Sequence, residues 1–291
     1  MTKFIFNILL LLSRRSKMKI AYVCTNYNNS VFTLAAVETL MRNVDHDVVV
    51  IVVDNASSKV EVAKLQLLSQ KYQSVYLIKN QTNVGYFRGL NIGLKELRER
   101  RPDIEWVVAG NNDLEFPTNF CDLVEENDQS LRVHSVISPD VVTLDGEHQN
   151  PHVISNISAI REIFYDLYYS NYYLGRFIYW LAKKFPKLSE RSDEEQWRIA
   201  RPIYQGHGSC YVLGPRFFQQ FTELWAPTFM MSEEFFLSKQ LMDVGEQVYY
   251  EPNIKIIHHW HGSLESIPSR KRWDMARDAH REYRKYVSVF R

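Results

Sequence analysis

The amino-acid sequence predicts an α/β fold in which a mostly parallel central sheet is flanked by helices. Apolar runs of strand length alternate with segments of helical periodicity over roughly the first 115 residues. One run, DVVVIVVD, is almost continuously β-branched, as is typical of a strand buried on both faces. Short polar groups follow several of these strands, and ligands bind beyond the carboxyl ends of the strands in such sheets.

The individual elements follow from the spacing of apolar residues. Continuous apolar runs predict buried strands, and a period near 3.6 residues predicts helices that cover them. The elements of the first half are, in order, the strand KIAYVC, the helix SVFTLAAVETLMRN, the strand DVVVIVVD, the helix KVEVAKLQLLSQKY, the strand SVYLIK, the glycine-rich helix GYFRGLNIGLKELRERR and the strand DIEWVVAG.

The middle of the chain has a different composition. From about Ile157 to Arg201, aromatic residues are dense and interleaved with Arg and Lys. This pattern predicts a helical insertion. Its aromatic residues either pack on the sheet or form a surface for a partner, because Tyr and Trp favour boundaries between apolar and polar surroundings.

Overall composition is that of a globular protein. Of 291 residues, 45% are hydrophobic and 24% are charged, which is ordinary for a single large domain. The net charge of +1 gives no reason to expect nucleic-acid binding. Cys24, Cys121 and Cys210 are scattered without a CxxC pair. This spacing argues against a structural zinc site and favours a reducing, cytoplasmic location.

The first residues do not form a standard targeting segment. The apolar run FIFNILLLL is shorter than the ~20 residues of a membrane span, and basic residues follow it instead of preceding it. Two interpretations stay open. Translation begins at Met18, or Arg14, Arg15, Lys17 and Lys19 lie near anionic lipid at a membrane interface.

Three short polar side chains, Asn111, Asn112 and Asp113, follow the apolar strand WVVA and Gly110. A turn would explain them, since Asn and Asp bond to their own backbone. The polar groups TNYNN and DNASS, however, also follow predicted strands. Three such groups converging on one edge of a sheet favour a ligand site there.

Two further groups carry candidate chemistry in the second half. Glu233 and Glu234 begin a predicted helix, where they either stabilise the helix dipole or provide a general base. His258, His259 and His261 end a predicted strand and fit a metal- or phosphate-binding edge. Because side chains alternate along a strand, we expect His259 and His261 on one face and His258 on the other.

The order of these motifs resembles the family-2 inverting glycosyltransferases of the GT-A fold, and among them the bacterial rhamnosyltransferase-like members that build surface polysaccharides. The glycine-rich piece is the most specific. The resemblance extends from about Lys19 to Ser263, and its motifs are TNYNN, VVDNASS, NVGYFRGLNIGL, GNNDLEF, SEEFFLSKQLMDVGEQVYYEP and IIHHWHGS.

The resemblance implies how the chain is divided. It places the nucleotide-binding half of the catalytic domain before the acceptor half. The expected parts are an apolar and basic extension (1–17), a GT-A domain (18–263) with a nucleotide-binding half (18–116) and an acceptor half (117–263), the helical insertion (about 157–201) and a C-terminal helical tail (264–291).

The resemblance also implies the donor site. Asp54 would hydrogen-bond the pyrimidine, with Asn55 beside it. The loop from Asn83 would pass close to the donor, where glycine allows a close backbone approach. The residues expected to contact the donor are Thr25, Asn26, Tyr27, Asp54, Asn55, Asn83, Gly85, Arg88, Asn91, Asn111 and Asn112.

The metal and the base are implied in the same way. Asn111, Asn112 and Asp113 take the place of the family's Asp-x-Asp motif, with Asn111 in place of its first acid. Asp113 would bind a divalent cation, Mg²⁺ or Mn²⁺, and the histidines would complete the site. Glu234 or Glu233 would be the base that activates the acceptor hydroxyl.

The expected donor is a UDP- or dTDP-sugar, and the expected acceptor is a glycan, lipid-linked, at the inner membrane face in capsule or O-antigen synthesis. Three alternatives stay open. A sugar-nucleotide nucleotidyltransferase would need a glycine-rich basic loop after the first strand, where the chain has TNYNNS. A degenerate nucleotide-binding scaffold is consistent with Asn111. A hydrolase using the histidines would lack the HExxH pair.

Overall fold

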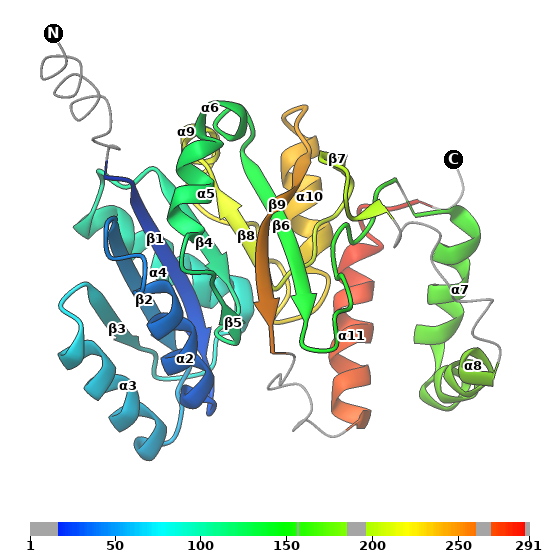
Figure 1. Ribbon diagram of the computed structural model, residues 1–291. Coiled ribbons are helices and arrows are strands. Elements are labelled where there is room, and N and C mark those ends of the chain that lie inside the picture. The colour runs from blue at the N-terminus through cyan, green and yellow to red at the C-terminus, as the bar shows by residue number, and fades with distance from the viewer. Residues whose placement is uncertain (1–16, 156, 185–195, 260–268, 289–291) are drawn as a thin grey trace, which may run out of the picture.

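The computed structural model describes residues 17–155, 157–184, 196–259 and 269–288. The expectations for residues 1–16 and for His261 therefore lie outside the described residues. Nine strands form one sheet in the order β3-β2-β1-β4-β8-β6-β9-β5, and β7 pairs with β9 off this path. Helices lie on both faces of the sheet (Figure 1). The predicted α/β class with a central sheet flanked by helices is confirmed.

The first half of the sheet is entirely parallel. β2 and β4 flank β1, and β3 pairs with the outer side of β2. Asn26 lies opposite Asp54, and Cys24 lies opposite Gly110, so the carboxyl ends of three strands meet at one edge. The elements are β1 (Lys19–Asn26), α2 (Ser30–Leu40), β2 (Asp47–Asp54), α3 (Lys59–Lys71), β3 (Val75–Lys79), α4 (Tyr86–Arg100) and β4 (Trp106–Gly110).

Antiparallel pairs enter in the second half. β8 runs antiparallel to both β4 and β6, whereas β9 runs parallel to β6 and antiparallel to β5. Leu114 pairs with His258, which brings the end of β9 to the residues that follow β4. These elements are β5 (Leu114–Glu115), α5 (Phe120–Glu126), α6 (Asp128–Leu131), β6 (Val136–Thr143), β7 (Arg201–Ile203), β8 (Cys210–Leu213), α9 (Pro215–Gln220), α10 (Glu233–Met242) and β9 (Val248–His258).

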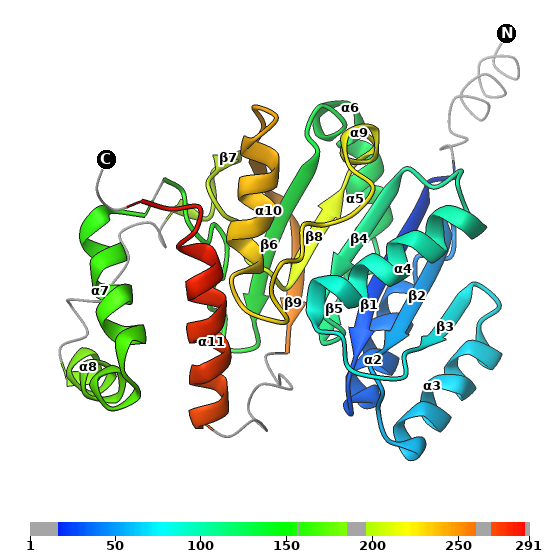
Figure 2. The ribbon, with the colours of Figure 1, turned by 180° about the vertical axis from the view of Figure 1, so that it is seen from behind.

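Each face of the parallel strands has its own hydrophobic core. Along β1, Tyr22 and Cys24 pack toward α2, α3 and α5, while Ala21 and Val23 pack toward α4. α10 covers the same face as α4, as the reverse view shows (Figure 2). This alternation explains why β2 reads as an uninterrupted apolar run, because both of its faces are buried.

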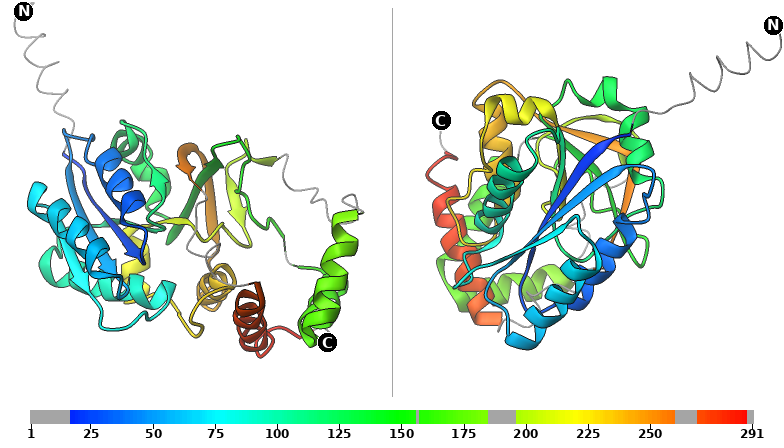
Figure 3. Two further views of the ribbon diagram at one scale, coloured as in Figure 1. Left: turned by 90° about the horizontal axis from the view of Figure 1, so that it is seen from below. Right: turned by 90° about the vertical axis from the view of Figure 1, so that its left-hand side faces the viewer.

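Two helices lie within the segment predicted as a helical insertion, α7 (Ala159–Ser170) and α8 (Tyr172–Lys184). A third, α11 (Ser269–Tyr283), lies within the predicted tail and stands between α10 and α7 (Figures 1 and 3). His280 Nε2 lies 2.8 Å from Asp166 Oδ1, and the Tyr283 hydroxyl donates to Glu162. Tyr169 and Tyr172 of this region contact Trp273 of α11, whereas Phe164, Tyr173, Phe177 and Trp180 are exposed.

Within the part of the chain that the structure describes, no helix combines the length and apolar character that crossing a bilayer requires.

Candidate active site

Asn26 organises the carboxyl ends of β1 and β2. Its Nδ2 donates to Asp54 Oδ1 at 2.9 Å and to Ser57 Oγ at 3.0 Å. Its Oδ1 accepts from Thr33 Oγ1 at 2.8 Å and from Asn112 Nδ2 at 3.2 Å. Asn26, Asp54 and Asn112 are all buried. This network fixes the loops beyond both strands to the segment that follows β4.

The predicted donor contacts thus divide into buried and exposed groups. Asp54 is 1% exposed, and its other oxygen accepts from the Ser57 backbone at 3.0 Å. Asn55 is also buried and donates to the Gly85 carbonyl at 3.0 Å. Tyr27, in contrast, is 42% exposed. Tyr27 can therefore contact a ligand directly, whereas Asp54 and Asn55 hold the loops at this edge through buried hydrogen bonds.

Gly85 has a specific steric requirement. Its φ is +94°, and a Cβ there would lie 1.9 Å from the Phe229 carbonyl oxygen. Asn83 Oδ1 accepts the Gly85 backbone N–H at 3.0 Å. The Tyr86 backbone N–H then donates to the same Phe229 carbonyl at 3.1 Å. Glycine at this position lets the 224–229 segment approach α4, and the predicted approach of a donor stays a prediction.

Arg88 and Asn91 hold the same segment. Arg88 Nε donates to the Ala226 carbonyl at 3.2 Å, and its Nη2 donates to the Pro227 carbonyl at 3.0 Å. Asn91 exchanges two hydrogen bonds with the Leu224 backbone at 2.7 and 2.8 Å. Both side chains therefore position the 224–229 segment, and their donor contact stays a prediction.

Asp113 meets His258 where β4 and β9 end. Asp113 Oδ1 lies 3.2 Å from His258 Nε2, and both side chains are buried. Burial by itself raises the pKa of Asp113, but the contact with His258 outweighs this effect and leaves the pKa below its ordinary value. The carboxylate is therefore ionised at neutral pH.

The protonation of His258 decides what this pair can bind. Its Nδ1 lies 2.7 Å from Gln149 Oε1, an acceptor, and its Nε2 lies 3.2 Å from the Asn111 amide nitrogen, a donor. The Gln149 contact fits a proton on Nδ1, and the direction of the contact at Nε2 follows from the tautomer of the ring. Nε2 also faces Asp113 Oδ1 at 3.2 Å, the spacing of an ion pair when the ring is protonated.

A divalent cation can take the place of the proton between these two atoms. The ligand types also fit, because Asp113 supplies a carboxylate oxygen and His258 an imidazole nitrogen whose other nitrogen is fixed by Gln149. These residues therefore fit a divalent cation. Asn111, predicted to share the motif, lies beside them and donates toward His258 Nε2.

His259 does not join this pair. His259 is only partly buried, and its Nε2 lies 3.0 Å from Glu115 Oε2. His258, and not His259, lies beside Asp113. This agrees with the expected alternation of these two side chains along the strand. His261 belongs to the part of the chain outside the described residues.

A short segment, 206–209, connects the Asp113 side of the edge with the glutamate pair. The Asn111 backbone N–H donates to the Ser209 carbonyl at 2.7 Å. On the other side, the Gly208 N–H donates to Glu234 Oε1 at 3.2 Å. A Cβ at Gly208 would lie 2.6 Å from that same oxygen, so glycine permits the contact. The segment places Glu234 at the same edge as Asp113.

His207 lies inside this segment and was not predicted from the sequence. Its ring centroid is 5.8 Å from that of His258, and its Nδ1 lies 2.8 Å from Ser209 Oγ. Burial, and then the neighbouring His152, lower the pKa of His207 to about 3, so the ring is neutral at physiological pH. A histidine between two glycines just before a strand was the signal available in the sequence.

The two glutamates have different surroundings. Glu234 lines a cavity of about 330 Å³, whereas Glu233 is buried and does not line it. Burial, followed by the charge of Glu234, raises the pKa of Glu233 to about 8. Glu233 is therefore mostly protonated at neutral pH, and Glu234 is the carboxyl group that a substrate can reach.

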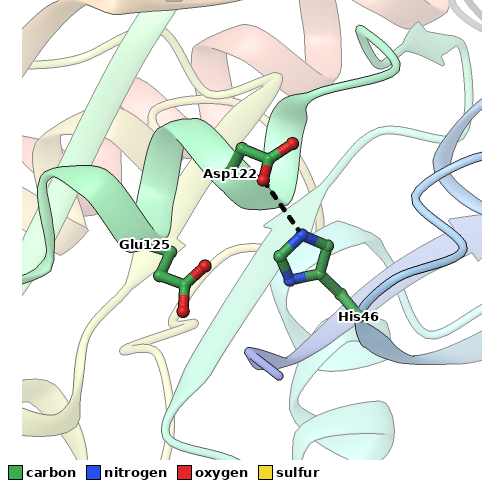
Figure 4. Close-up of side chains that lie close together, drawn as sticks. All are labelled: His46, Asp122 and Glu125. Carbon is green, nitrogen blue, oxygen red and sulfur yellow. Dashed lines mark ion pairs between the residues drawn. The ribbon is translucent and has the colours of Figure 1, made fainter. Parts of the chain in front are cut away.

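A second group of possible metal ligands lies elsewhere. His46, Asp122 and Glu125 bring ligand atoms within 4.8 Å of one another, and His46 Nε2 lies 3.4 Å from Asp122 Oδ1 (Figure 4). His46 precedes the first residue of β2, whereas Asp113 follows the last residue of β4. Because β2 and β4 run parallel, this group lies at the opposite edge of the sheet and plays no part in the site around Asp113.

Solved structures with related folds include a mannosyltransferase and a structure with UDP, GalNAc and Mn²⁺. The chain is similar to S. aureus TarS 1–349 with 11% identity and a TM-score of 0.51, over 83% of this chain and 60% of that one. It is similar to GalNAc-T7, solved with UDP, GalNAc and Mn²⁺, with 12% identity and a TM-score of 0.54, over 89% and 47% of the two chains.

It is also similar to the mannosyltransferase PcManGT from Pyrobaculum calidifontis, solved with GDP-Man and Mn²⁺. Here the identity is 11% and the TM-score 0.55, over 99% of this chain and 72% of that one. The chain thus spans less than two thirds of the TarS and GalNAc-T7 chains. At these identities the likeness establishes the GT-A fold.

No curated protein sequence matches the chain. A family model described as glycosyl transferase family 2 matches residues 23–185. The matched segment contains the end of β1, the strands β2, β3 and β4, and Asp113, whereas Glu234 and His258 lie beyond it. Because it covers more than half of the sequence, the chain belongs to glycosyl transferase family 2.

Proposed function

We propose that the protein transfers a sugar, with inversion, from a nucleotide-sugar donor to a glycan acceptor. One observation carries the proposal. The Asp113 and His258 pair and the cavity-lining Glu234 lie at one edge of the sheet, connected through the 206–209 segment. A cation-binding carboxylate and a separate, accessible carboxylate are the two groups that such a transfer needs.

The chain's own residues would divide the reaction between them. Asp113 and His258 would hold a divalent cation, which supplies charge neutralisation for the donor diphosphate. Glu234 would take the proton from the acceptor hydroxyl, which attacks the anomeric carbon opposite the leaving diphosphate. The Gly208 N–H holds Glu234 Oε1 at 3.2 Å and so orients the carboxylate. No described residue hydrogen-bonds to its Oε2.

The donor nucleotide is expected to be UDP or dTDP from the resemblance. The solved neighbours carry UDP in GalNAc-T7 and GDP-Man in PcManGT, each with Mn²⁺. We therefore include GDP and CMP beside UDP and dTDP in a thermal-shift panel, with and without Mn²⁺. A ligand that binds the folded state raises the unfolding temperature, and we expect one nucleotide to do so more strongly with Mn²⁺.

An exposed apolar face on the α7–α8 pair supports a lipid-linked acceptor at a cytoplasmic membrane face. Arg176 and Lys184 belong to α8, which carries part of this face. Cations beside exposed apolar side chains favour an anionic lipid surface. The large exposed side chains of the face are Ile160, Phe164, Leu167, Tyr173, Phe177 and Trp180.

Flotation with vesicles tests this arrangement. We expect binding to vesicles of phosphatidylcholine and phosphatidylglycerol, and loss of binding in Phe177→Ser with Trp180→Ser. Val133→Ser, which removes a 59% exposed residue elsewhere, is the matched control. Equal flotation of both variants would remove the α7–α8 face from the proposal.

A degenerate scaffold that binds nucleotide without turnover is the second candidate, because Asn111 replaces the first acid of the family motif. Accessible Glu234 and the Asp113–His258 pair argue against it. Release of free nucleoside diphosphate from a sugar nucleotide distinguishes a transferase from a scaffold, since a scaffold releases none.

A further inference from the structure

The cavity beside Glu234 is enclosed by parts of the chain far apart in sequence. α7 and α11 form one side, and the start of α10 with the segment around Gln205 forms the other. Its volume of about 330 Å³ lies at the lower end of small-ligand pockets, which span about 300–1,000 Å³. The cavity is therefore large enough for a small ligand that reaches the carboxylate of Glu234.

α7 presents one stripe of side chains to this cavity. Arg161, Tyr165 and Tyr169 are spaced four residues apart, so they lie on one helix face. The two tyrosines give the cavity flat aromatic surfaces with polar edges, which suit the apolar faces and hydroxyl rims of a sugar ring. The opposite stripe on α11 begins with the small residue Ala276, which leaves room between the helices.

The charged groups of the cavity are not equally available. His280 lies 2.8 Å from Asp166, and Tyr283 donates to Glu162, so these side chains are used to join α7 and α11. Arg161 Nε donates to the Tyr165 hydroxyl at 3.1 Å, and no described carboxylate forms an ion pair with Arg161. Its guanidinium is therefore the cation that the cavity can offer to a ligand.

We propose that this cavity binds an acceptor sugar that carries an anionic group, with Arg161 binding the anion and Tyr165 and Tyr169 lining the sugar ring. The inference rests on the proposed transferase function, because Glu234 at the cavity wall is the base of that function. A phosphate or a carboxylate on the acceptor would supply the same chemistry.

Binding of small probes tests this assignment without the natural acceptor. Glucose, glucose 1-phosphate and glucuronate, with the matching galactose series, are titrated calorimetrically in the presence of the best-binding nucleotide and Mn²⁺. We expect an anionic sugar to bind about tenfold or more tighter than its neutral parent, as charged hydrogen bonds imply. Preference for the 1-phosphate indicates a phosphate-bearing acceptor, and preference for the uronate a sugar acid.

Arg161→Gln should remove this preference while leaving nucleotide binding intact. Arg281→Gln is the matched control, because it removes the same charge from α11 at an exposed position that does not line the cavity. Equal affinity for neutral and anionic sugars, no sugar binding at all, or an unchanged preference in Arg161→Gln would overturn the inference. Failure of the wild-type protein to bind any nucleotide would instead refute the proposed function itself.

Discussion

The donor edge and the acceptor side of this molecule are built differently. At the donor edge, Asn26, Asp54 and Asn112 are buried and bonded to one another where parallel strands end. On the acceptor side, α7 and α8 leave large apolar side chains exposed and meet the rest of the chain mainly through α11. In the proposed function, the first region would hold the donor diphosphate in a fixed geometry, whereas the second would admit a glycan.

The largest expected effect concerns Glu234, the carboxylate between the two regions. Glu234→Gln should lower turnover by about 10²–10⁴-fold, because it removes a positioned base while keeping the shape of the side chain. Nucleotide affinity should stay unchanged. Release of nucleoside diphosphate from the sugar nucleotide measures turnover, and calorimetry measures nucleotide affinity.

Glu233→Gln is the matched comparison for that variant. Glu233 does not line the cavity and is mostly protonated at neutral pH, so its loss should cost less turnover than the loss of Glu234. The reverse order of the two rates would transfer the base role to Glu233.

Gln149→Leu should weaken binding at the donor edge and leave binding on the acceptor side unchanged. Gln149 fixes the His258 ring through Nδ1, and loss of such a partner typically costs about 10–100-fold in metal affinity. Mn²⁺-dependent nucleotide binding should weaken by this factor, whereas probe binding at Arg161 should persist. Titration of Mn²⁺ in the presence of nucleotide measures the change, and an unaltered Mn²⁺ affinity would contradict the metal assignment of His258.

Gly85→Ala tests how rigidly the donor edge is packed. The positive φ and the approach of the Phe229 carbonyl leave no space for a Cβ, so the substitution should destabilise the fold by about 1–3 kcal/mol. Gly146→Ala is a useful control, because Gly146 has a similar φ of +87° with open space around it. Urea denaturation should show the larger loss for Gly85, and equal losses would mean that φ alone matters.

The raised pKa of Glu233 also predicts a pH dependence of stability. Glu233 has a folded pKa of about 8 against an ordinary value of 4.5. Between these values the unfolded chain loses its proton while the folded protein keeps it, so stability falls as pH rises from 4.5 toward 8. Glu233→Gln should show a shallower fall over this window in urea denaturation at pH 5, 6.5 and 8. Parallel curves for the two proteins would contradict the raised pKa.

The sequence supported the donor edge better than the acceptor side for a physical reason. Strand periodicity and the polar residues that end each strand are local signals, and they located Asp54 and Asp113 at one sheet edge. They did not reveal that Arg88 and Asn91 bind the 224–229 segment, because that contact joins residues more than a hundred positions apart.

The acceptor side depends on such distant contacts throughout. Aromatic density predicted the helices of the insertion but not their packing on α11, since nothing in the local pattern of α7 identifies its partner. Likewise, the pair Glu233 and Glu234 was visible in the sequence. Only the fold shows that Glu234 lines the cavity and Glu233 does not.

Calorimetric titration of UDP, dTDP and GDP into the wild-type protein and Asp113→Ala, with and without Mn²⁺, tests the donor edge most directly. We predict that one nucleotide binds the wild-type protein more tightly with Mn²⁺, and that Asp113→Ala stays folded but loses this gain. A folded wild-type protein that binds none of the three, or an Asp113→Ala variant with the full Mn²⁺ gain, would contradict the account.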